Sequence, residues 1–300
     1  MTTAPWIVVL AGGEGKRLHS LTRALYGVDL PKQFAVLAGD RTLLQQTIER
    51  ALRLTVPERV LVVVSTAREA IAREQLAPYG ALELVVQPHN LDTGPGLLLP
   101  LIRIFAHEPS GYVAVLPSDH FIANEAPIVA ALDRRPDVLT LLGVQPTQPD
   151  PEYGYIVRGS RNGRAHAIAR FVEKPELELA TQLVADGALW NTFISTGPVA
   201  TYWELARRFL PQHAARFEHY AIAIGSLGEP SALECAYRGM TAANFSSDIL
   251  ARAPGLAVDA VEGSGWSDWG SPRRVFEALA GTPDHDRLLA RIRLPFAQAS

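Results

Sequence analysis

Hydrophobic and polar positions in the first half of the chain form two alternating kinds of segment. Short apolar runs typical of buried strands occur at residues 6–11, 59–65, 82–86, 112–116 and 137–143. Between them, apolar residues recur with helical spacing at residues 42–54, 67–76, 94–107 and 125–134. Strands that alternate with helices predict a mostly parallel sheet covered on both faces. We therefore expect a doubly wound α/β fold.

The pattern changes after residue 143. Two strand-like segments, 153–158 and 165–172, flank Asn162-Gly163, a dipeptide that favours a hairpin turn. A further strand is predicted at 255–261, and helices at 175–185, 198–209, 211–224, 272–280 and 284–292. We expect one domain over residues 1–282, with halves 1–145 and 146–282. The second half contains the β-hairpin, and a short helical tail follows at 283–300.

Composition and charge exclude several classes of protein. The 300 residues are 48% hydrophobic, and 28 Lys+Arg against 31 Asp+Glu give a net charge of −3, unlike a disordered or a basic nucleic-acid-binding chain. Cys235 is the sole cysteine, so neither an internal disulfide nor a cysteine-rich zinc site can form. No apolar stretch approaches the roughly 20 residues of a membrane span. We expect a soluble, cytoplasmic protein with no nucleic-acid or membrane partner.

The turn after the first strand has the composition of an anion site. Gly12, Gly13 and Gly15 allow the backbone to approach an anion and to direct N–H groups at it. Arg17 adds a guanidinium suited to phosphate, and Lys32 supplies a second cation nearby in the sequence. A tight turn that simply requires glycine is the structural alternative.

Two familiar phosphate-binding patterns do not fit this turn. The dinucleotide fingerprint G-x-G-x-x-G fails because Leu18 stands at its third glycine, which disfavours a nicotinamide-dependent oxidoreductase. The P-loop pattern fails because Leu10 replaces its first glycine and Arg17 follows Lys16. A serine hydrolase is disfavoured as well, since the G-x-S-x-G elbow is missing.

The glycine-rich turn is the first of several motifs that occur in a fixed order across nearly the whole chain. They are L-A-G-G-E-G-K-R-L, P-K-Q-F, L-P-S-D-H, G-V-Q-P-T, Y-G-Y-I, F-V-E-K-P, W-N and G-W-S-D-W-G. This series resembles the sugar-1-phosphate nucleotidylyltransferases, most of all the mannose-1-phosphate guanylyltransferases. The resemblance implies a Rossmann-like nucleotidyltransferase fold, with a nucleotide-binding half at 1–145 and a sugar-phosphate-binding half at 146–282.

The resemblance also implies a reaction. An oxygen of a sugar 1-phosphate attacks the α-phosphorus of a nucleoside triphosphate, and pyrophosphate leaves. Alignment and neutralisation of phosphate charge carry such a reaction, so no protein nucleophile is needed. Arg17 and Lys32 are then the catalytic cations, and Asp119 and Asp268 are the ligands of Mg²⁺, which takes one or two carboxylates and keeps several waters. Asp119 follows a predicted strand, and ligands in such sheets bind at the carboxyl ends of strands.

Further residues acquire binding roles from the same resemblance. The nucleotide-binding set is Leu10, Gly12, Gly13, Gly15, Gln87, Pro88, Thr93 and Ser118. The sugar-phosphate-binding set is Gly154, Glu173, Lys174 and Asn191, with Lys174 on the phosphate and Glu173 and Asn191 on hydroxyl groups. A plain surface ion pair is the alternative for Glu173 and Lys174. His120 is expected to be structural.

The chain departs from the family pattern where that pattern meets the base. Gln87 stands for a glutamate, and Leu91, Asp92 and Gly94 stand for arginine, asparagine and alanine. A glutamate accepts two N–H groups of guanine, whereas a glutamine offers one acceptor and two donors and also suits thymine or uracil. GTP with mannose 1-phosphate is the favoured pair. A thymidylyl- or uridylyltransferase acting on glucose 1-phosphate or another sugar 1-phosphate is the alternative.

Two other departures leave the expected chemistry in place. Lys16 replaces a threonine or serine of the glycine loop, and Thr192-Phe193 replaces Ser-Gly, which narrows the expected sugar pocket. A non-catalytic regulatory relative that binds nucleotide sugars is a second alternative. The presence of all five catalytic and metal-binding candidates disfavours it; they are Arg17, Lys32, Asp119, Lys174 and Asp268. Relatives often dimerise, so a homodimer is an open expectation.

Overall fold

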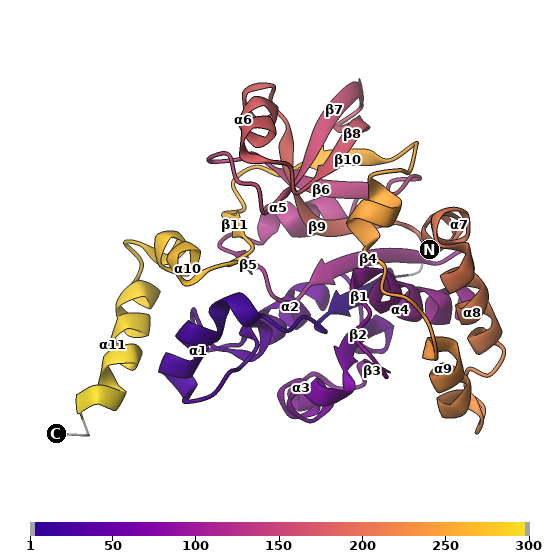
Figure 1. The fold of residues 1–300 in the computed structure, drawn as a ribbon, viewed down its shortest axis with the longest axis horizontal. Helices are drawn as coiled ribbons and strands as arrows, with labels where there is room; N and C mark the ends of the chain where they lie inside the picture. Colours follow the sequence, from indigo (N-terminus) through magenta and orange to yellow (C-terminus); the bar gives the residue numbers. More distant parts are fainter. Residues whose placement is uncertain (1–3, 298–300) are drawn as a thin grey trace.

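A computed structural model describes residues 4–297 of the chain, with side chains as far as residue 292. Its main sheet has nine strands in the order β3-β2-β1-β4-β9-β6-β10-β8-β7 (Figure 1). Their bounds are β1 Trp6–Leu10, β2 Val60–Ser65, β3 Glu83–Gln87, β4 Tyr112–Pro117, β6 Thr140–Val144, β7 Gly154–Asn162, β8 Ala165–Glu173, β9 Leu189–Pro198 and β10 Ala257–Ala260. None of the described helices is long and apolar enough to cross a membrane.

The first four strands form the parallel sheet that the alternating pattern predicts. β3, β2, β1 and β4 pair in parallel, so their carboxyl ends meet at one edge. β1 is buried on both faces: Val8 packs into one core and Ile7 and Val9 into the other. The first core contains α4 (Thr93–His107), α7 (Val199–Phe209), α8 (Pro211–Ala221) and α9 (Glu229–Tyr237). The second contains α2 (Leu43–Ala51), α3 (Glu69–Leu76) and α5 (Ala126–Leu132). The doubly wound α/β arrangement is confirmed here.

The rest of the sheet is mixed, which corrects the expectation of a mostly parallel sheet: only β6 and β10 pair in parallel there. β9 runs antiparallel to β4, β6 and β7, and β8 runs antiparallel to β7 and β10. Because β7 also pairs with β9, the strands β9-β6-β10-β8-β7 close into a small barrel. The predicted tight turn at Asn162-Gly163 accounts for the antiparallel pairing of β7 with β8, since strands joined by such a turn must run antiparallel. Helix α6 (Leu177–Ala185) packs on this barrel.

A small third core covers the glycine-rich turn. It is built from α1 (His19–Tyr26), α10 (Pro272–Leu279) and α11 (Pro283–Ala297), with Leu18 and Trp269 between them. A two-stranded sheet of β5 (Phe121–Ile122) and β11 (Trp266–Ser267) lies nearby and brings the segments around residues 119 and 268 together. The predicted tail helix is confirmed as part of α11. The remaining helical turns are η1 Lys16–Leu18, η2 Lys32–Phe34, η3 Pro57–Arg59, η4 Thr66–Arg68, η5 Ala77–Tyr79 and the π-helical η6 Phe245–Leu250.

Candidate active site

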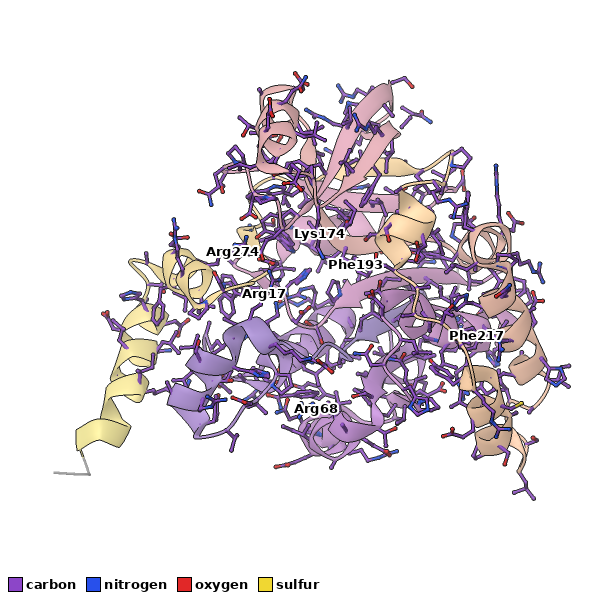
Figure 2. The ribbon with its side chains drawn as sticks, in the orientation of Figure 1. Arg17, Arg68, Lys174, Phe193, Phe217 and Arg274 are labelled. Carbon is purple, nitrogen blue, oxygen red and sulfur yellow. The ribbon has the colours of Figure 1, made fainter. Side chains whose placement is uncertain are left out.

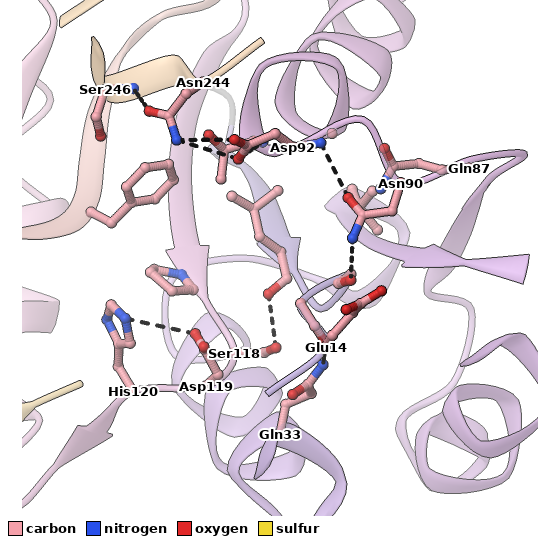
Figure 3. Close-up of a pocket in the computed structure, with 18 of the residues that line it drawn as sticks. Glu14, Gln33, Gln87, Asn90, Asp92, Ser118, Asp119, His120, Asn244 and Ser246 are labelled. Atoms are coloured by element: carbon pink, nitrogen blue, oxygen red, sulfur yellow. Dashed lines mark hydrogen bonds and ion pairs between the residues drawn. The ribbon is translucent and has the colours of Figure 1, made fainter. Parts of the chain in front are cut away.

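A cavity of about 610 Å³ opens at the carboxyl edge of the parallel strands, between them and the barrel. The sequence-predicted residues that line it are Leu10, Gly12, Gly13, Arg17, Gln87, Thr93, Ser118, Asp119, Glu173 and Lys174. Figure 3 labels Gln87, Ser118 and Asp119 among them. The other sequence-predicted residues do not line it; they are Gly15, Lys32, Pro88, Gly154, Asn191 and Asp268. Several lining residues were not predicted, among them Gln33, Asn90 and Asn244, whereas Phe193 was expected to narrow the pocket. Residues from both halves of the chain therefore share one cavity.

The glycine-rich turn is held in shape by Gln33, from the P-K-Q-F motif. Gln33 Nε2 donates to the carbonyl oxygens of Ala11 at 3.0 Å and Gly13 at 2.6 Å. Gly15 has a left-handed backbone (φ 62°), and a Cβ there would lie 3.0 Å from the backbone nitrogen of Lys32. Only glycine fits such a close approach without strain. The turn therefore keeps the open form that an anion site requires.

Two more polar residues brace the same turn from the neighbouring strands. Ser118 follows β4 and donates to the carbonyl oxygen of Leu10 from both its hydroxyl (2.8 Å) and its backbone N–H (3.0 Å). Asn90 follows β3 and donates to the carbonyl oxygen of Gly12 at 3.4 Å. These bonds occupy carbonyl oxygens of the turn, so N–H groups of the turn are left to face a negatively charged ligand.

Asp119 lies two residues beyond β4, and one third of its side chain is exposed. Lys32 Nζ lies 3.2 Å from Asp119 Oδ2 and also donates to the backbone oxygen of Asp268. Burial alone would raise the pKa of Asp119, but Lys32 and His120 outweigh it and hold that pKa below its usual range. Asp119 is therefore an ionised carboxylate that faces the cavity.

His120 contacts Asp119 as a neutral imidazole. Burial lowers the pKa of His120 below its usual value. Trp266 Nε1 donates to His120 Nδ1 at 3.3 Å, which leaves the ring proton on Nε2, 3.6 Å from Asp119 Oδ1. This position agrees with the structural role expected for His120, because the ring lies between Trp266 and the Asp119 carboxylate and contacts both.

Asp268 is nearly buried and is held by four donors. Tyr153 donates its hydroxyl at 2.6 Å and Gly270 its backbone N–H at 3.0 Å, both to Oδ1. Arg274 Nη1 lies 3.0 and 3.2 Å from the two carboxylate oxygens, and Arg17 Nη2 lies 3.6 Å from Oδ2. Burial raises the pKa of Asp268, but the hydrogen bond from Tyr153 and the surrounding cations lower it by more. Asp268 is therefore ionised and fixed in orientation.

Arg17 and Arg274 share acidic partners at the mouth of the barrel. Arg17 Nη1 lies 2.7 Å from Glu152, and Arg274 Nη2 contacts both Glu152 (3.2 Å) and Asp150. Both guanidinium groups lie where the barrel meets the parallel strands (Figure 2). Arg274 was missed by the sequence reasoning, although its position six residues beyond Asp268 was a usable signal.

The barrel contributes Glu173 and Lys174 to the cavity. Gly154 pairs with Glu173 across β7 and β8, and a Cβ on Gly154 would lie 2.6 Å from Glu173 Oε2. Burial raises the pKa of Glu173, and the Lys174 ammonium, 4.0 Å away, opposes the shift. Asn191 instead accepts the backbone N–H of Phe193 at 3.1 Å, and Phe193 is the one of this pair that lines the cavity.

Residues 91–94, where the chain departs from the family pattern, are hydrogen-bonded to the distant residues 243–245. The backbone N–H of Gly94 donates to Ala243 at 2.7 Å, and that of Ala243 donates to Leu91 at 3.1 Å. The hydroxyl of Thr93 accepts the backbone N–H of Phe245 at 2.9 Å. A Cβ on Gly94 would lie 2.6 Å from the Ala243 oxygen, so this position requires glycine. Thr93 is thereby fixed at the cavity wall.

The charges of the lining residues bear on whether a metal fits. Two cations face the cavity, Arg17 and Lys174, against four carboxylates, Glu14, Asp92, Asp119 and Glu173. Within residues 4–297 no cluster of three or more histidine, cysteine, aspartate or glutamate side chains could hold a metal. Mg²⁺ does not require such a cage, because it is bound by one or two carboxylates together with substrate phosphates. Asp119 and Asp268 are both ionised, and Lys32 links the Asp119 carboxylate to the Asp268 backbone, so the two carboxylates suit that mode.

Comparisons with known proteins show which proteins this chain resembles. Mannose-1-phosphate guanylyltransferase of Escherichia coli (strain K12) is 31% identical over 298 residues, which cover 92% of this chain and 60% of that protein. ManC of Salmonella typhimurium (strain LT2) is 32% identical over the same shares of the two chains. The chain thus spans about 60% of the length of these curated relatives.

Solved structures and a family model extend the comparison. A Thermus thermophilus protein, described as a mannose-1-phosphate geranyltransferase, superposes with a TM-score of 0.79 at 28% identity, over 94% of this chain and 81% of its own. The inositol-1-phosphate CTP transferase of T. maritima shares the fold, with a TM-score of 0.59 at 15% identity and 97% coverage of both chains. Residues 7–284 match the family model described as nucleotidyl transferase. The chain therefore belongs to the nucleotidyl transferase family.

Proposed function

We propose that this chain transfers a nucleotidyl group from a nucleoside triphosphate to a sugar 1-phosphate and releases pyrophosphate. The observation that carries the proposal is the single cavity in which the glycine-rich turn, Asp119 and Lys174 meet. A guanylyltransferase acting on mannose 1-phosphate is the favoured form, since the curated relatives named above carry that description. A thymidylyl- or uridylyltransferase is the alternative that Gln87 leaves open.

In the proposed mechanism the side chains align two phosphate groups and neutralise their charge. N–H groups of the glycine-rich turn bind the triphosphate, and Arg17 and Lys32 balance the charge that develops on the leaving pyrophosphate. Lys174 binds the sugar phosphate and brings its oxygen in line with the α-phosphorus. Arg17 must then leave Glu152, its partner at 2.7 Å, to reach the triphosphate.

Asp119 and Asp268 would hold Mg²⁺ in this proposal. Bound there, the ion would supply positive charge at the α-phosphate, in a cavity whose own lining carries more carboxylates than cations. Tyr153, Gly270 and Arg274 keep the Asp268 carboxylate in one orientation. His120, whose Nε2 lies 3.6 Å from Asp119 Oδ1, supports the Asp119 carboxylate.

The test measures pyrophosphate release with Mg²⁺, for GTP, UTP, dTTP, CTP and ATP against mannose 1-phosphate and glucose 1-phosphate. One preferred pair is expected. Asp119→Asn should lower its turnover by about 100-fold or more, because a neutral amide binds Mg²⁺ weakly and the positive charge that the ion would supply at the α-phosphate is lost. Asp40→Asn, at a side chain that is 87% exposed, is the matched control and should leave the rate unchanged.

Full activity of Asp119→Asn would contradict the proposed role of this carboxylate. Absence of turnover with every pair, together with a nucleotide-induced rise in melting temperature, would favour the non-catalytic regulatory relative instead.

A further inference from the structure

The Gln87 side chain is enclosed between two glycines at the cavity wall. It stands at the carboxyl end of β3, lines the cavity and is only 3% exposed. A Cβ on Gly12 would lie 3.2 Å from Gln87 Nε2, and a Cβ on Gly96 would lie 3.4 Å from its Oε1. The carboxamide therefore has little room to move, and its orientation decides which hydrogen-bonding group a ligand meets.

A hydroxyl group from a distant helix sets that orientation. Tyr237 lies on α9, is 1% exposed and donates its hydroxyl to Gln87 Oε1 at 3.3 Å. Burial holds the pKa of Tyr237 far above its usual range, so the hydroxyl remains protonated and available as a donor. Phe217 packs edge-on against the Tyr237 ring at 5.7 Å and fixes the ring from α8. With Oε1 engaged, Nε2 is directed towards Gly12 and the cavity.

A carboxamide held in this way offers a ligand only N–H donors. A donor matches a carbonyl oxygen, as in guanine O6 or uracil and thymine O4. It opposes an exocyclic amino group, as in adenine N6 or cytosine N4, because two donors then meet and neither is satisfied. The glutamate of the family pattern would have the reverse character, since an ionised carboxylate only accepts.

We infer that Tyr237 is a positioning residue that makes the site selective for bases with a carbonyl group. Gln87 contacts the base, and Tyr237 holds the Gln87 amide nitrogen towards it. The inference rests on the proposed function, because it assumes that the cavity binds a nucleotide with its base beside Gln87. It goes further by assigning a selectivity filter to a residue of the α7–α9 helical layer, outside the nucleotide-binding half.

Binding of the free nucleotides tests the inference separately from catalysis. Affinities of GTP, ITP, UTP, dTTP, ATP and CTP are measured by calorimetry with Mg²⁺ and without a sugar phosphate. The carbonyl bases are expected to bind at least 10-fold more tightly than ATP and CTP. ITP lacks the 2-amino group of guanine and should bind like GTP at this contact.

Tyr237→Phe removes the hydroxyl and keeps the ring. The freed Gln87 amide can then turn, so the preference for carbonyl bases should fall by about 10-fold, mainly through tighter ATP and CTP binding. Tyr220→Phe is the matched control, because Tyr220 is also buried in the helical layer and its hydroxyl contacts Arg103 and Glu229 instead of the cavity. It should leave the preference unchanged.

Gln87→Glu gives a second variant with a different prediction. It replaces the donor by an acceptor, so ATP and CTP should gain affinity relative to UTP. Melting temperatures confirm that each variant folds.

The binding and turnover results together decide the inference and the proposed function separately. Equal affinity of the wild type for all six nucleotides, or an unchanged preference in Tyr237→Phe, would overturn the inference. A clear carbonyl preference in binding that falls in Tyr237→Phe, with no turnover of any pair, would sustain it while the proposed function fails.

Discussion

Three residues that line the cavity have left-handed backbones although none is a glycine. They are Asp92 (φ 69°), Lys174 (φ 45°) and Phe193 (φ 60°). Such conformations cost about 1–3 kcal/mol at a non-glycine residue and persist where the surrounding structure enforces them. Trp269, directly after Asp268, is a fourth (φ 44°). Backbone strain is therefore concentrated in and beside the cavity.

Lys174→Gly should raise the free energy of unfolding while it lowers the rate of nucleotidyl transfer. Relief of about 1–3 kcal/mol of backbone strain exceeds the roughly 0.5–1 kcal/mol entropic cost of glycine, so the free energy of unfolding should rise by about 1 kcal/mol. Loss of the ammonium should lower nucleotidyl transfer by at least about 10-fold. Urea titration and pyrophosphate release measure the two effects.

The control for Lys174→Gly is Arg135→Gly. Arg135 also has a left-handed backbone (φ 48°) but does not line the cavity, so the substitution should leave the rate unchanged. A Lys174→Gly variant that transfers at the wild-type rate would remove Lys174 from the mechanism.

The sequence predicted those site residues that are tied to a local motif. Asp119 and Gln87 each follow a readable strand, so their position at the carboxyl edge followed from the α/β pattern. Arg274, Glu152 and Tyr237 reach the site only through tertiary packing. No local spacing connects Tyr237 to Gln87, 150 residues apart, so sequence reasoning had no signal for that pair.

At the scale of elements, α10 is attached to the active site through one side chain. Arg274 is 15% exposed and contacts Asp150, Glu152 and Asp268, from two different segments. Its guanidinium also lies over the Tyr153 ring, 4.7 Å from the centroid. The helix thus fixes the Asp268 carboxylate together with the loop before β7.

Arg274→Ala should destabilise the protein by about 3 kcal/mol, because it leaves buried carboxylates without their cation. The adjacent Arg273→Ala is the matched control: that side chain is 78% exposed, and its ion pair with Glu277 is worth at most about 1 kcal/mol. Urea unfolding of both variants measures the difference. Equal destabilisation by the two would show that the Arg274 contacts add nothing to stability.

Not every element could be predicted from periodicity. β9 was not predicted as a strand, because polar residues interrupt its apolar pattern. They are buried and bonded: Thr192 donates its hydroxyl to Leu142 at 2.7 Å, and Ser195 lies 2.8 Å from the Tyr202 hydroxyl. The amphipathic helices α2, α7 and α8 were predicted because each has one apolar face on the core. α1, α9 and the π-helical turn Phe245–Leu250 were not anticipated.

At the scale of the whole molecule, the cavity lies between the parallel strands, which we propose bind the nucleotide, and the barrel, which we propose binds the sugar phosphate. The two halves could be predicted from the change of pattern after residue 143. The closed barrel could not, because it depends on pairing between β7 and β9 at only Tyr155 and Ile156. Registers of this kind are set by tertiary contacts rather than by the local sequence.

The excess of carboxylates around the cavity predicts that nucleotide and metal stabilise the protein together. GTP alone should raise the melting temperature little, because its phosphates meet Asp119 and Glu173 without compensation. GTP with Mg²⁺ should raise it clearly; a ligand at 100 times its Kd adds about 2.7 kcal/mol. Differential scanning fluorimetry with and without EDTA measures this. An equal rise in both conditions would exclude metal-coupled binding.

β9 is the strand that both halves share. β4 has β1 and β9 as its neighbours, and β6 lies between β9 and β10. A fragment that ended at residue 145 would therefore lose one partner strand of β4 and both partner strands of β6. Strand edges left unpaired in this way are prone to aggregation. We therefore expect that neither half folds alone, because β9 pairs with strands of both halves, and that the two halves unfold together.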